Sequence, residues 1–488
     1  MDAATENRMQ TWVGKELRTV DIGDVRLDAR LALILDRLSA KPTLSIPAAC
    51  RTEAEKDGAY RFFDNKNVTE WDILQPHHDA TLRRVKAEPI VLMPQDTTEI
   101  DVTRREEEVG GPLNDSNRRG LFAHIQLALT PQRLSLGVTH ADIWKREDEE
   151  FDQPQAEKRK KRRAKTIDQK ESGRWLEGYR QACEVAQKCP QTQVISLSDS
   201  EGDIYECYVE GAPTEGRKAD WIVRACQDRA LVGGKPRLRQ SILSTPVLGT
   251  MTIEVSKREP STGDGRKRRQ ARTSARKAQV TVRAKRVLLR PPRRPGGVKL
   301  PAVWVNAVLV LEENPPEGEP AVEWLLLTSL PVKTFAEAVK VTEYYCCRWE
   351  VEVYFRVLKS GCRVESLQFE TSERLTKCLA VYLIVAWRVL YLTMLGRTQP
   401  GMRCDAVLDE AEWKSVYEVV SGKAAPKIPP TLAEVIKMIA KLGGYQGRKH
   451  DGPPGPKTMW IGMQRMHDLA MAWSQFGPNA RQTKPETQ

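Results

Sequence analysis

The chain has 488 residues, which is too long for one ordinary hydrophobic core, so two to four domains are expected. A hydrophobic content of 40% indicates a folded rather than a disordered protein. The formal net charge of +12 is unevenly spread, because residues 158–165 and 266–277 are dense basic runs. Each run alone could be a solvated loop or a linker, but two of them favour binding to a polyanion such as nucleic acid.

Cysteine and hydropathy patterns exclude several other classes of protein. The ten cysteines are scattered, without the paired spacing of a zinc site, and they suit a reducing cytoplasm better than a disulfide framework. The N-terminus has no signal-peptide pattern, and the most apolar segment, residues 379–395, is interrupted by Arg388. That segment is predicted to be too short and too mixed to span a bilayer, so a soluble cytoplasmic protein with no membrane partner is expected.

Residues 1–86 are predicted to form a helical domain. One helix follows Gly23-Asp24, and two more are expected over 52–63 and 70–85. The apolar positions of the first helix form one stripe: Leu27, Leu31, Ile34, Leu35 and Leu38. Arg26 and Arg30 lie on another face of that helix. Arginines on one side of a small helical domain are typical of DNA-reading surfaces, although they are also common on ordinary ones.

Residues 87–210 are predicted to form an α/β core. The predicted elements are strands over 90–93, 122–129 and 134–143, a helix over 171–187 and a strand over 193–197. This order is that of a ribonuclease-H-like core, although it is not specific to one. Asp96 and Asp199 each follow a strand, so both carboxylates emerge at one end of the sheet if those strands are neighbours. Taken alone, each aspartate is more typical of a turn or a helix cap.

The second half of the chain is predicted to interrupt and then complete this core. Residues 211–320 look like a β-rich insertion, with strands over 221–224, 250–255, 279–287 and 303–311. Residues 321–370 return to the core through a buried strand over 324–329 and a long helix over 335–360. Residues 371–488 are predicted to be helical, with helices over 374–395, 410–420, 432–442 and 460–473.

The helix predicted over 335–360 carries an unusual polar stripe. Its members are Tyr345, Arg348, Glu352 and Lys359, which at ~100° per residue fall within an arc of roughly 60°, and Arg356 joins them. An Arg348–Glu352 ion pair on a solvated face would stabilise the helix by only tenths of a kcal/mol. That alternative does not explain a one-sided polar stripe in an otherwise hydrophobic helix.

Three separated carboxylates suit metal-assisted phosphodiester chemistry. Two divalent ions about 3.5–4 Å apart can act on the attacking and leaving oxygens, and Mg²⁺ needs only oxygen ligands and water. Asp96, Asp199 and Glu352 are the candidate ligands. Cations beside such a carboxylate suit a site that grips DNA phosphates.

These residues resemble a known family signature. The pattern Tyr-x2-Arg-x3-Glu-x6-Lys, found in bacterial cut-and-paste DDE transposases that excise through a DNA hairpin, matches Tyr345, Arg348, Glu352 and Lys359 without a gap. Asp96 lies in Asp-Thr-Thr, as in that family. Asp199 begins DSEGDIYE, where Asp203 is similar to a flanking position and not to the metal ligand. Further similar segments span most of the chain: GDVRLDARL, DGAYRFF, NPPEGEP, WLLLTSLPV and LAEVIKMIAKLGGY.

The resemblance implies a defined chemistry. Asp96, Asp199 and Glu352 would hold two Mg²⁺ per active site, for which Mn²⁺ can substitute. The enzyme would nick one strand at the element end, form a hairpin, open it with water and join the 3′ ends to target DNA. Tyr345, Arg348 and Lys359 would clamp phosphates near the hairpin. Trp324 would stack on a base flipped from it, whereas without the resemblance core packing is the simpler interpretation of that residue.

The resemblance also implies partners and a domain plan. Residues 1–86 would bind the terminal inverted repeats through Arg26 and Arg30, and residues 371–488 would form a helical dimerisation domain. Arg224 and the basic insertion are further candidate DNA contacts. Such a homodimer would act on DNA in the bacterial cytoplasm, associated with the nucleoid. Two alternatives stay open: a structure-specific nuclease of the same fold, and a non-catalytic DNA-binding regulator derived from a transposase, against which the presence of all three carboxylates counts.

Overall fold

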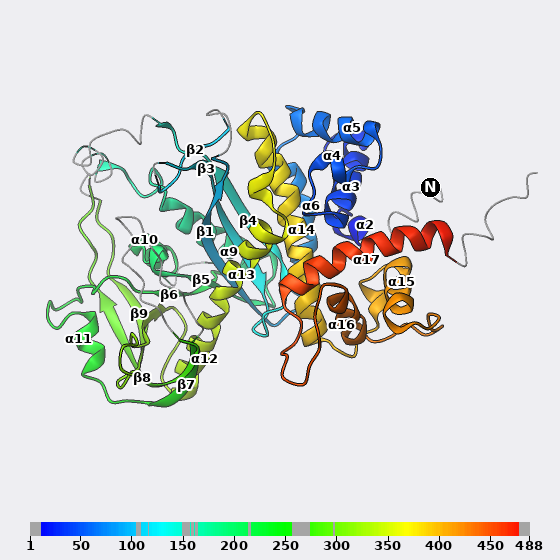
Figure 1. Cartoon of the computed structure of the whole chain (residues 1–488). Helices are drawn as coiled ribbons and strands as arrows, with labels where there is room; N and C mark the ends of the chain where they lie inside the picture. Colours follow the sequence, from blue (N-terminus) through cyan, green and yellow to red (C-terminus); the bar gives the residue numbers. More distant parts are fainter. Residues whose placement is uncertain are drawn as a thin grey trace, which may run out of the picture.

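The computed structural model describes residues 11–477 apart from 104–108, 116, 149–156, 158–160, 162–163, 213–215, 256–273 and 296–297. Most of both basic runs therefore lies outside the described residues. The described part has a mixed α/β fold, with helices gathered at its N-terminal and C-terminal ends (Figure 1). The predicted α/β class with helical terminal regions is confirmed.

A mixed sheet of ten strands, counted over the described residues, forms the α/β part of the molecule. The strands are β1 (Ile90–Asp101), β2 (Gly111–Pro112), β3 (Arg119–Leu129), β4 (Ser135–Trp144), β5 (Gln193–Ser198), β6 (Asp220–Arg224), β7 (Gly249–Val255), β8 (Arg276–Leu289), β9 (Val303–Leu311) and β10 (Glu323–Thr328). Their order is β2-β3-β1-β5-β6-β10-β9-β8-β7, with β4 paired to β3. Strands β1, β5 and β6 are parallel to one another, and β3 and β10 flank them in the antiparallel direction. The strands predicted within 211–320 therefore extend the same sheet.

The N-terminal helices are α2 (Trp12–Glu16), α3 (Val25–Ala40), α4 (Ile46–Ala49), α5 (Glu53–Asp64) and α6 (Glu70–Lys86). Side-chain caps fix several of their starts: Asp24 accepts a hydrogen bond from an early backbone N–H of α3, and Thr69 forms a capping box with Asp72 at α6. Within the sheet region lie α9 (Gly173–Lys188), α10 (Tyr205–Glu210), α11 (Leu238–Leu243), α12 (Phe335–Cys346) and α13 (Glu350–Arg356).

The C-terminal helices are α14 (Ser372–Thr398), α15 (Glu410–Ser421), α16 (Leu432–Leu442) and α17 (Pro456–Phe476). Helix α14 runs through the middle of the molecule and contacts α3, α5, α6, β4, α16 and α17. It is long and apolar enough to cross a membrane, contrary to the prediction that this segment is too short. However, 94% of its most apolar stretch is buried inside the protein. Its hydrophobicity is thus explained by its place at the centre of the core.

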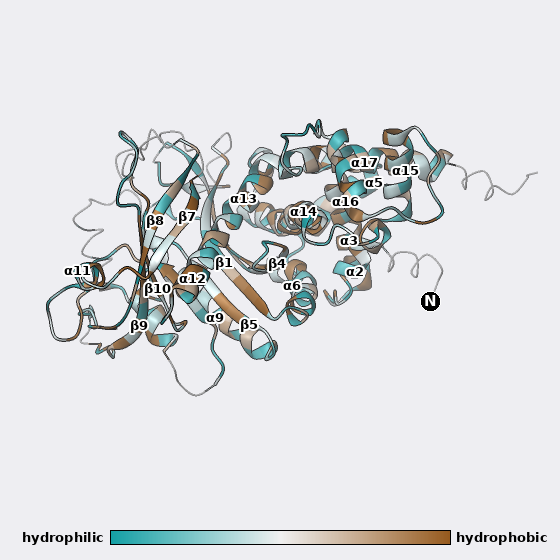
Figure 2. Cartoon of the chain, turned by 90° about the horizontal axis from the view of Figure 1, so that it is seen from below, coloured by the Kyte–Doolittle hydropathy of each residue, from teal (hydrophilic) through white to brown (hydrophobic). Residues whose placement is uncertain are grey.

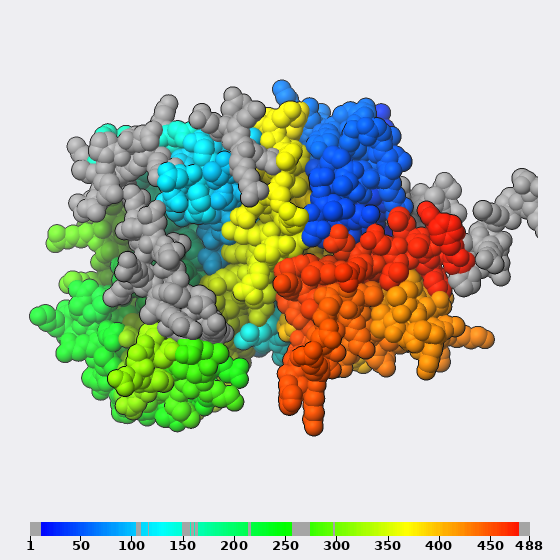
Figure 3. Space-filling model, viewed as in Figure 1, coloured from blue at the N-terminus to red at the C-terminus, as the bar shows by residue number. Residues whose placement is uncertain are grey.

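The views of the whole chain show how the parts meet. In Figure 3 the segment just before and within α14, coloured yellow, lies between the cyan strands and the blue N-terminal helices. The red α17 crosses beside those N-terminal helices, in agreement with its contacts to α3. Figure 2 shows hydrophobic residues along central strands such as β5, where five of six residues are buried. The sheet and the terminal helices therefore share one continuous hydrophobic core.

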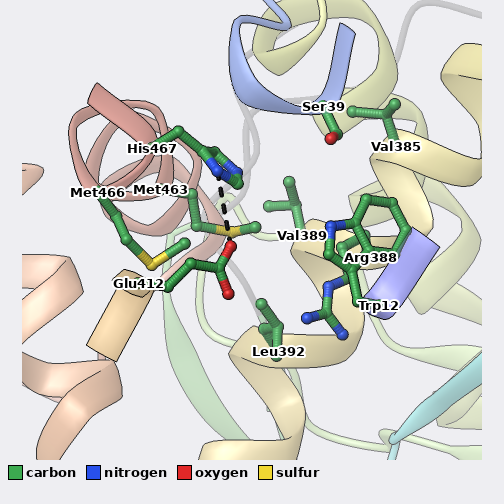
Figure 4. Close-up of a pocket in the computed structure, with 10 residues that line it drawn as sticks. All are labelled: Trp12, Ser39, Val385, Arg388, Val389, Leu392, Glu412, Met463, Met466 and His467. Carbon is green, nitrogen blue, oxygen red and sulfur yellow. Dashed lines mark ion pairs between the residues drawn. The ribbon is translucent and has the colours of Figure 1, made fainter. Parts of the chain in front are cut away.

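A cluster of charged residues lies where the N-terminal and C-terminal helices meet α14. Arg388 of α14 donates a hydrogen bond to the Val407 carbonyl, and its guanidinium lies 5.0 Å from the centre of the Trp12 ring. His467 Nδ1 of α17 lies 3.5 Å from Glu412 Oε1 of α15 in the same pocket (Figure 4). The cavity among them has about 10 Å³, the space of one water molecule. This cluster joins the first helix, the central helix and the last helix.

Candidate active site at the ends of two parallel strands

Asp96 and Asp199 lie side by side where the pairing of β1 with β5 ends. Asp96 lies inside β1, because that strand continues to Asp101, well beyond the strand predicted over 90–93. Strands β1 and β5 are parallel neighbours, and the last paired residues are Pro94 and Leu197. Asp96 and Asp199 each come two residues beyond that pair, so the register brings them to the same level. The Asp199 carboxylate also accepts a hydrogen bond of 2.7 Å from the Glu201 backbone N–H, which fixes the tight turn after β5.

Arg348 links the first aspartate to the third predicted carboxylate. Its Nη1 lies 3.1 Å from Asp96 Oδ2, and its Nη2 lies 2.8 Å from Glu352 Oε1. The guanidinium is almost fully buried, whereas 43% of the Glu352 side chain is exposed. The structure thus brings together three acidic residues that are far apart in the sequence, with one face of the site open to solvent.

The carboxylates repel one another strongly enough to change the pKa of Asp96. Burial and the nearby charge of Asp199 raise the pKa of Asp96 from 3.8 to about 7, while Arg348 opposes that rise. In the absence of a cation, Asp96 is therefore half-protonated near neutral pH. A site that pushes carboxylates together in this way favours binding of a positive ion.

The polar stripe does not lie on one regular helix as predicted. The segment consists of α12, a 3-10 turn over Cys347–Trp349, α13 and a π-helical turn over Val357–Gly361. The assumed ~100° per residue therefore does not hold across it. Arg348 lies on the 3-10 turn, where its ion pair with Asp96 ties the chain to β1. Long-range contacts, rather than the helical period, determine which side chains face the site.

Tyr345, Trp324 and Arg224 surround the carboxylates. The Tyr345 and Trp324 rings pack edge to face, with centroids 5.8 Å apart. Tyr345 is buried, whereas Trp324 is half-buried near the start of β10 and so is not a fully enclosed core residue. Arg224 ends β6 and donates a hydrogen bond of 3.2 Å to Ser200 Oγ, next to Asp199. These three residues form one wall of the site.

The remaining predicted contacts lie farther from the carboxylates. Lys359 is 3.5 Å from Glu365 Oε1 and lines a surface hollow beyond the end of β1. Arg356 is exposed. In the N-terminal helices, Arg26 is exposed but paired with Asp24, and the Arg30 guanidinium packs against Gly58 of α5.

Asp203 has a structural place in the fold. Its carboxylate is buried, pairs with Arg229, accepts a hydrogen bond of 2.6 Å from the Tyr208 hydroxyl and accepts two more from backbone N–H groups at 226 and 227. All of its lone pairs are therefore engaged. Sequence reasoning did not identify Arg229, because no motif marks a partner that lies 26 residues away.

The chemical type of the candidate ligands suits divalent cations. Asp96, Asp199 and Glu352 supply only carboxylate oxygens, the ligands that Mg²⁺ and Mn²⁺ prefer. Among the described residues, no three acidic, histidine or cysteine side chains converge on one point as they stand, because Arg348 lies between Asp96 and Glu352. The Tyr345 hydroxyl and Arg348 Nε are buried without a hydrogen-bond partner in the described structure. Polar capacity therefore remains for a ligand at this site.

Three family models match parts of the chain. Residues 9–68 match the family model "Transposase DNA-binding", residues 140–387 match "Transposase DDE domain", and residues 384–474 match "Transposase Tn5 dimerisation domain". The cryo-EM structure of the piggyBac transposase synaptic complex with hairpin DNA is similar with a TM-score of 0.35 and 8% identity, over 99% of this chain and 80% of that chain. Since the DDE domain model spans just over half of the residues, the chain belongs to the transposase DDE domain family and is a DNA transposase.

Proposed function

We propose that this transposase excises its element by Mg²⁺-dependent nicking, hairpin formation and hairpin resolution, and then joins the freed 3′ ends to target DNA. The observation that carries the proposal is the proximity of Asp96 in β1, Asp199 directly after β5, and Glu352, which Arg348 links to Asp96. The match of Tyr345, Arg348, Glu352 and Lys359 to the signature of hairpin-forming transposases supports the hairpin route.

The three carboxylates are proposed to hold two Mg²⁺, or Mn²⁺ in its place. When bound, such ions activate the attacking oxygen and stabilise the charge on the leaving oxygen. Asp96 would supply a ligand from β1, Asp199 from the turn directly after β5 and Glu352 from α13. Asp96 would bind the cation as a carboxylate, so a proton that it carries in the metal-free protein would be released.

Arg348 is proposed to exchange its partners when DNA and cations bind. In the DNA-free protein it neutralises Asp96 and Glu352. A cation that takes over those carboxylates releases the guanidinium, which can then hold a phosphate through its fork of N–H groups. Tyr345 would orient the same phosphate through its unpartnered hydroxyl, and Lys359 would hold the next one along the backbone.

Trp324 is proposed to stack on the base that leaves the strained hairpin. Its half-buried ring lies against Tyr345, beside the carboxylates, so it is available at the right place. Stacking on an aromatic ring is worth ~1–3 kcal/mol per base and offsets part of the cost of unpairing.

The rest of the DNA path follows the proposed domain plan. Residues 1–86 would bind the inverted repeats through Arg26 and Arg30, with Arg224 and Arg356 as added phosphate contacts at the catalytic core. Residues 87–210 and 321–370 would form that core around the insertion 211–320, and residues 371–488 would pair two copies in the end-bound complex. The protein would work on the bacterial nucleoid.

An end-cleavage assay tests the proposal. DNA flanking the gene is sequenced to find terminal inverted repeats, and a labelled duplex of one repeat is incubated with the protein and Mg²⁺. Nicked, hairpin and strand-transfer products are expected. Simple cutting without hairpins would assign a structure-specific nuclease, and retention without cutting would assign a DNA-binding regulator; either result would overturn the proposal.

A further inference from the structure

A buried polar network lies directly behind the two aspartates. Gln95 Nε2 donates to Ser196 Oγ at 3.3 Å and to Ser198 Oγ at 3.2 Å, and both serines belong to β5. On its other side, Gln95 Oε1 lies 2.9 Å from His124 Nε2 of β3. One amide therefore ties β1 to both of its neighbours at the level of the active site.

The side-chain orientations in the structure give the donor and acceptor roles in this network. With the Gln95 NH₂ toward the serines, its oxygen accepts from His124 Nε2–H. His124 Nδ1 then carries no proton and accepts from the Thr97 hydroxyl at 2.8 Å. Burial lowers the pKa of His124 to about 3, in agreement with a neutral ring. Gln95, His124, Ser196 and Ser198 are all buried, so each polar group depends on the others.

Alternation along the strands relates the network to the carboxylates. Gln95 and Thr97 point to one face of the sheet, and Asp96 between them points to the other. Ser198 is the last residue of β5 and directly precedes Asp199. The network face is covered by α9 (Figure 1), where a Cβ on Gly178 would collide with Gln95 Oε1. Asp96 instead meets Arg348 on the opposite face.

We propose that Gln95 is a positioning residue, which uses its bonds to Ser196, Ser198 and His124 to hold Asp96 and Asp199 at the spacing that a divalent cation requires. The inference deepens the proposed function and rests on it. Hydrogen bonds behind metal ligands typically change metal affinity ~10–100-fold when they are removed. Backbone pairing alone does not give this control, because the pairing of β1 with β5 ends at Pro94, before the aspartates.

The chain offers a matched control for this idea. Gln126 of β3 pairs in register with Gln95, is equally buried, and donates to the Gly178 carbonyl at 2.8 Å. Its other bond, at 3.2 Å, is to Thr139 of β4. It contacts the same helix but does not bridge β1 to β5. Gln95→Met and Gln126→Met thus remove the same chemistry from the same layer of the core.

The experiment measures Mn²⁺ binding by electron paramagnetic resonance in the full chain, together with thermal unfolding, for wild type, Q95M, Q126M, T97V and D96N. Similar falls in Tm are expected for Q95M and Q126M. The Kd for Mn²⁺ is expected to rise about 10-fold or more in Q95M, to rise about 3-fold in the milder T97V and to stay within about 2-fold in Q126M.

Two results would overturn different statements. The positioning role would be contradicted if T97V and Q126M bind Mn²⁺ as tightly as wild type and Q95M binds it as tightly as Q126M. The metal site itself would remain intact. If Q95M does not fold, the test depends on the Kd for Mn²⁺ of T97V compared with that of Q126M. A higher Kd in T97V than in Q126M supports the positioning role, and equal values contradict it. Unchanged Mn²⁺ binding in D96N would overturn the metal site of the proposed function, and the positioning role with it.

Discussion

The molecule contains two clusters in which a buried arginine meets acidic side chains, and they differ in what surrounds them. Arg348 lies at the open ends of strands, between Asp96 and Glu352, with Asp199 adding a further negative charge. Arg388 lies in a closed joint with Glu412 and His467, where only the space of one water remains (Figure 4). The first cluster has an excess of negative charge that can be reached from solvent, whereas the second is enclosed by the protein.

The difference separates a site for a ligand from a structural joint. Burial raises the pKa of Glu412 and raises that of Asp409 to about 6, and it lowers the pKa of His467 to about 4. Burial thus disfavours the charged form of each of these three groups around Arg388. Around Arg348 the mutual repulsion of carboxylates contributes as well, and a cation can relieve it. Perturbed pKa values occur in both clusters, and the proposed function assigns chemistry only to the open one.

Glu352→Ala gives the sharpest test of this contrast. It should lower DNA strand cleavage about 1,000-fold or more, since metal-held carboxylates act on the barrier, while DNA binding and Tm stay close to wild type. Gel assays of cleavage and retention with Mg²⁺ measure both. Cleavage at the wild-type rate would remove Glu352 from the catalytic set.

Arg388→Met is expected to act on stability instead. The variant leaves Glu412 buried without its cation, which should lower the free energy of unfolding by about 3–5 kcal/mol. Urea unfolding measures the loss, and cleavage per folded molecule should be unchanged. An unaltered urea midpoint would show that the Arg388 cluster does not hold the joint together.

Asp96→Asn tests how the charge of the open cluster makes stability depend on pH. In the folded, metal-free protein the pKa of Asp96 is about 7, above the unfolded value of 3.8. The stability that its protonated form contributes is therefore complete below about pH 4 and is lost as the pH rises through about 7. In EDTA, wild type should lose stability between pH 5 and pH 8 by roughly 1 kcal/mol or more beyond Asp96→Asn. Parallel urea midpoints at the two pH values would contradict the raised pKa.

Trp324→Ala should have the smallest effect, and Trp12→Ala is its counterpart in the closed cluster. Loss of stacking should slow hairpin formation about 10-fold relative to first-strand nicking, as single-turnover gels can resolve. Trp12→Ala should lower Tm and leave the ratio of the two rates unchanged. Equal slowing of both steps in Trp324→Ala would indicate a packing role for that ring.

Sequence patterns predicted much of this architecture. Apolar runs and capping residues located β5, the start of β1 and most helices. Asp199 directly follows β5, as those runs predicted, whereas Asp96 lies inside β1, which pairs with β3 up to Asp101. From the sequence alone, Arg388 is only an interruption of an apolar segment. Its structural role depends on partners on α15 and α17, which no local sequence pattern reveals.

The parts that could not be predicted depend on long-range contacts. The 3-10 turn at Arg348 accompanies an ion pair to a residue 252 positions earlier, and the helical period carries no signal of it. The Gln95 network joins residues that lie 29, 101 and 103 positions from Gln95 in the sequence. Polar residues inside a buried strand were the available signal, because a glutamine in such a place requires partners.

A crystal soaked in Mn²⁺ and measured at the manganese absorption edge tests the central claim most directly. The account predicts anomalous peaks within ligand distance of Asp96, Asp199 and Glu352, with the Arg348 guanidinium moved away from its present position between two carboxylates. A soaked crystal that shows no peak at the ends of β1 and β5, with Arg348 still bridging Asp96 and Glu352, would contradict it.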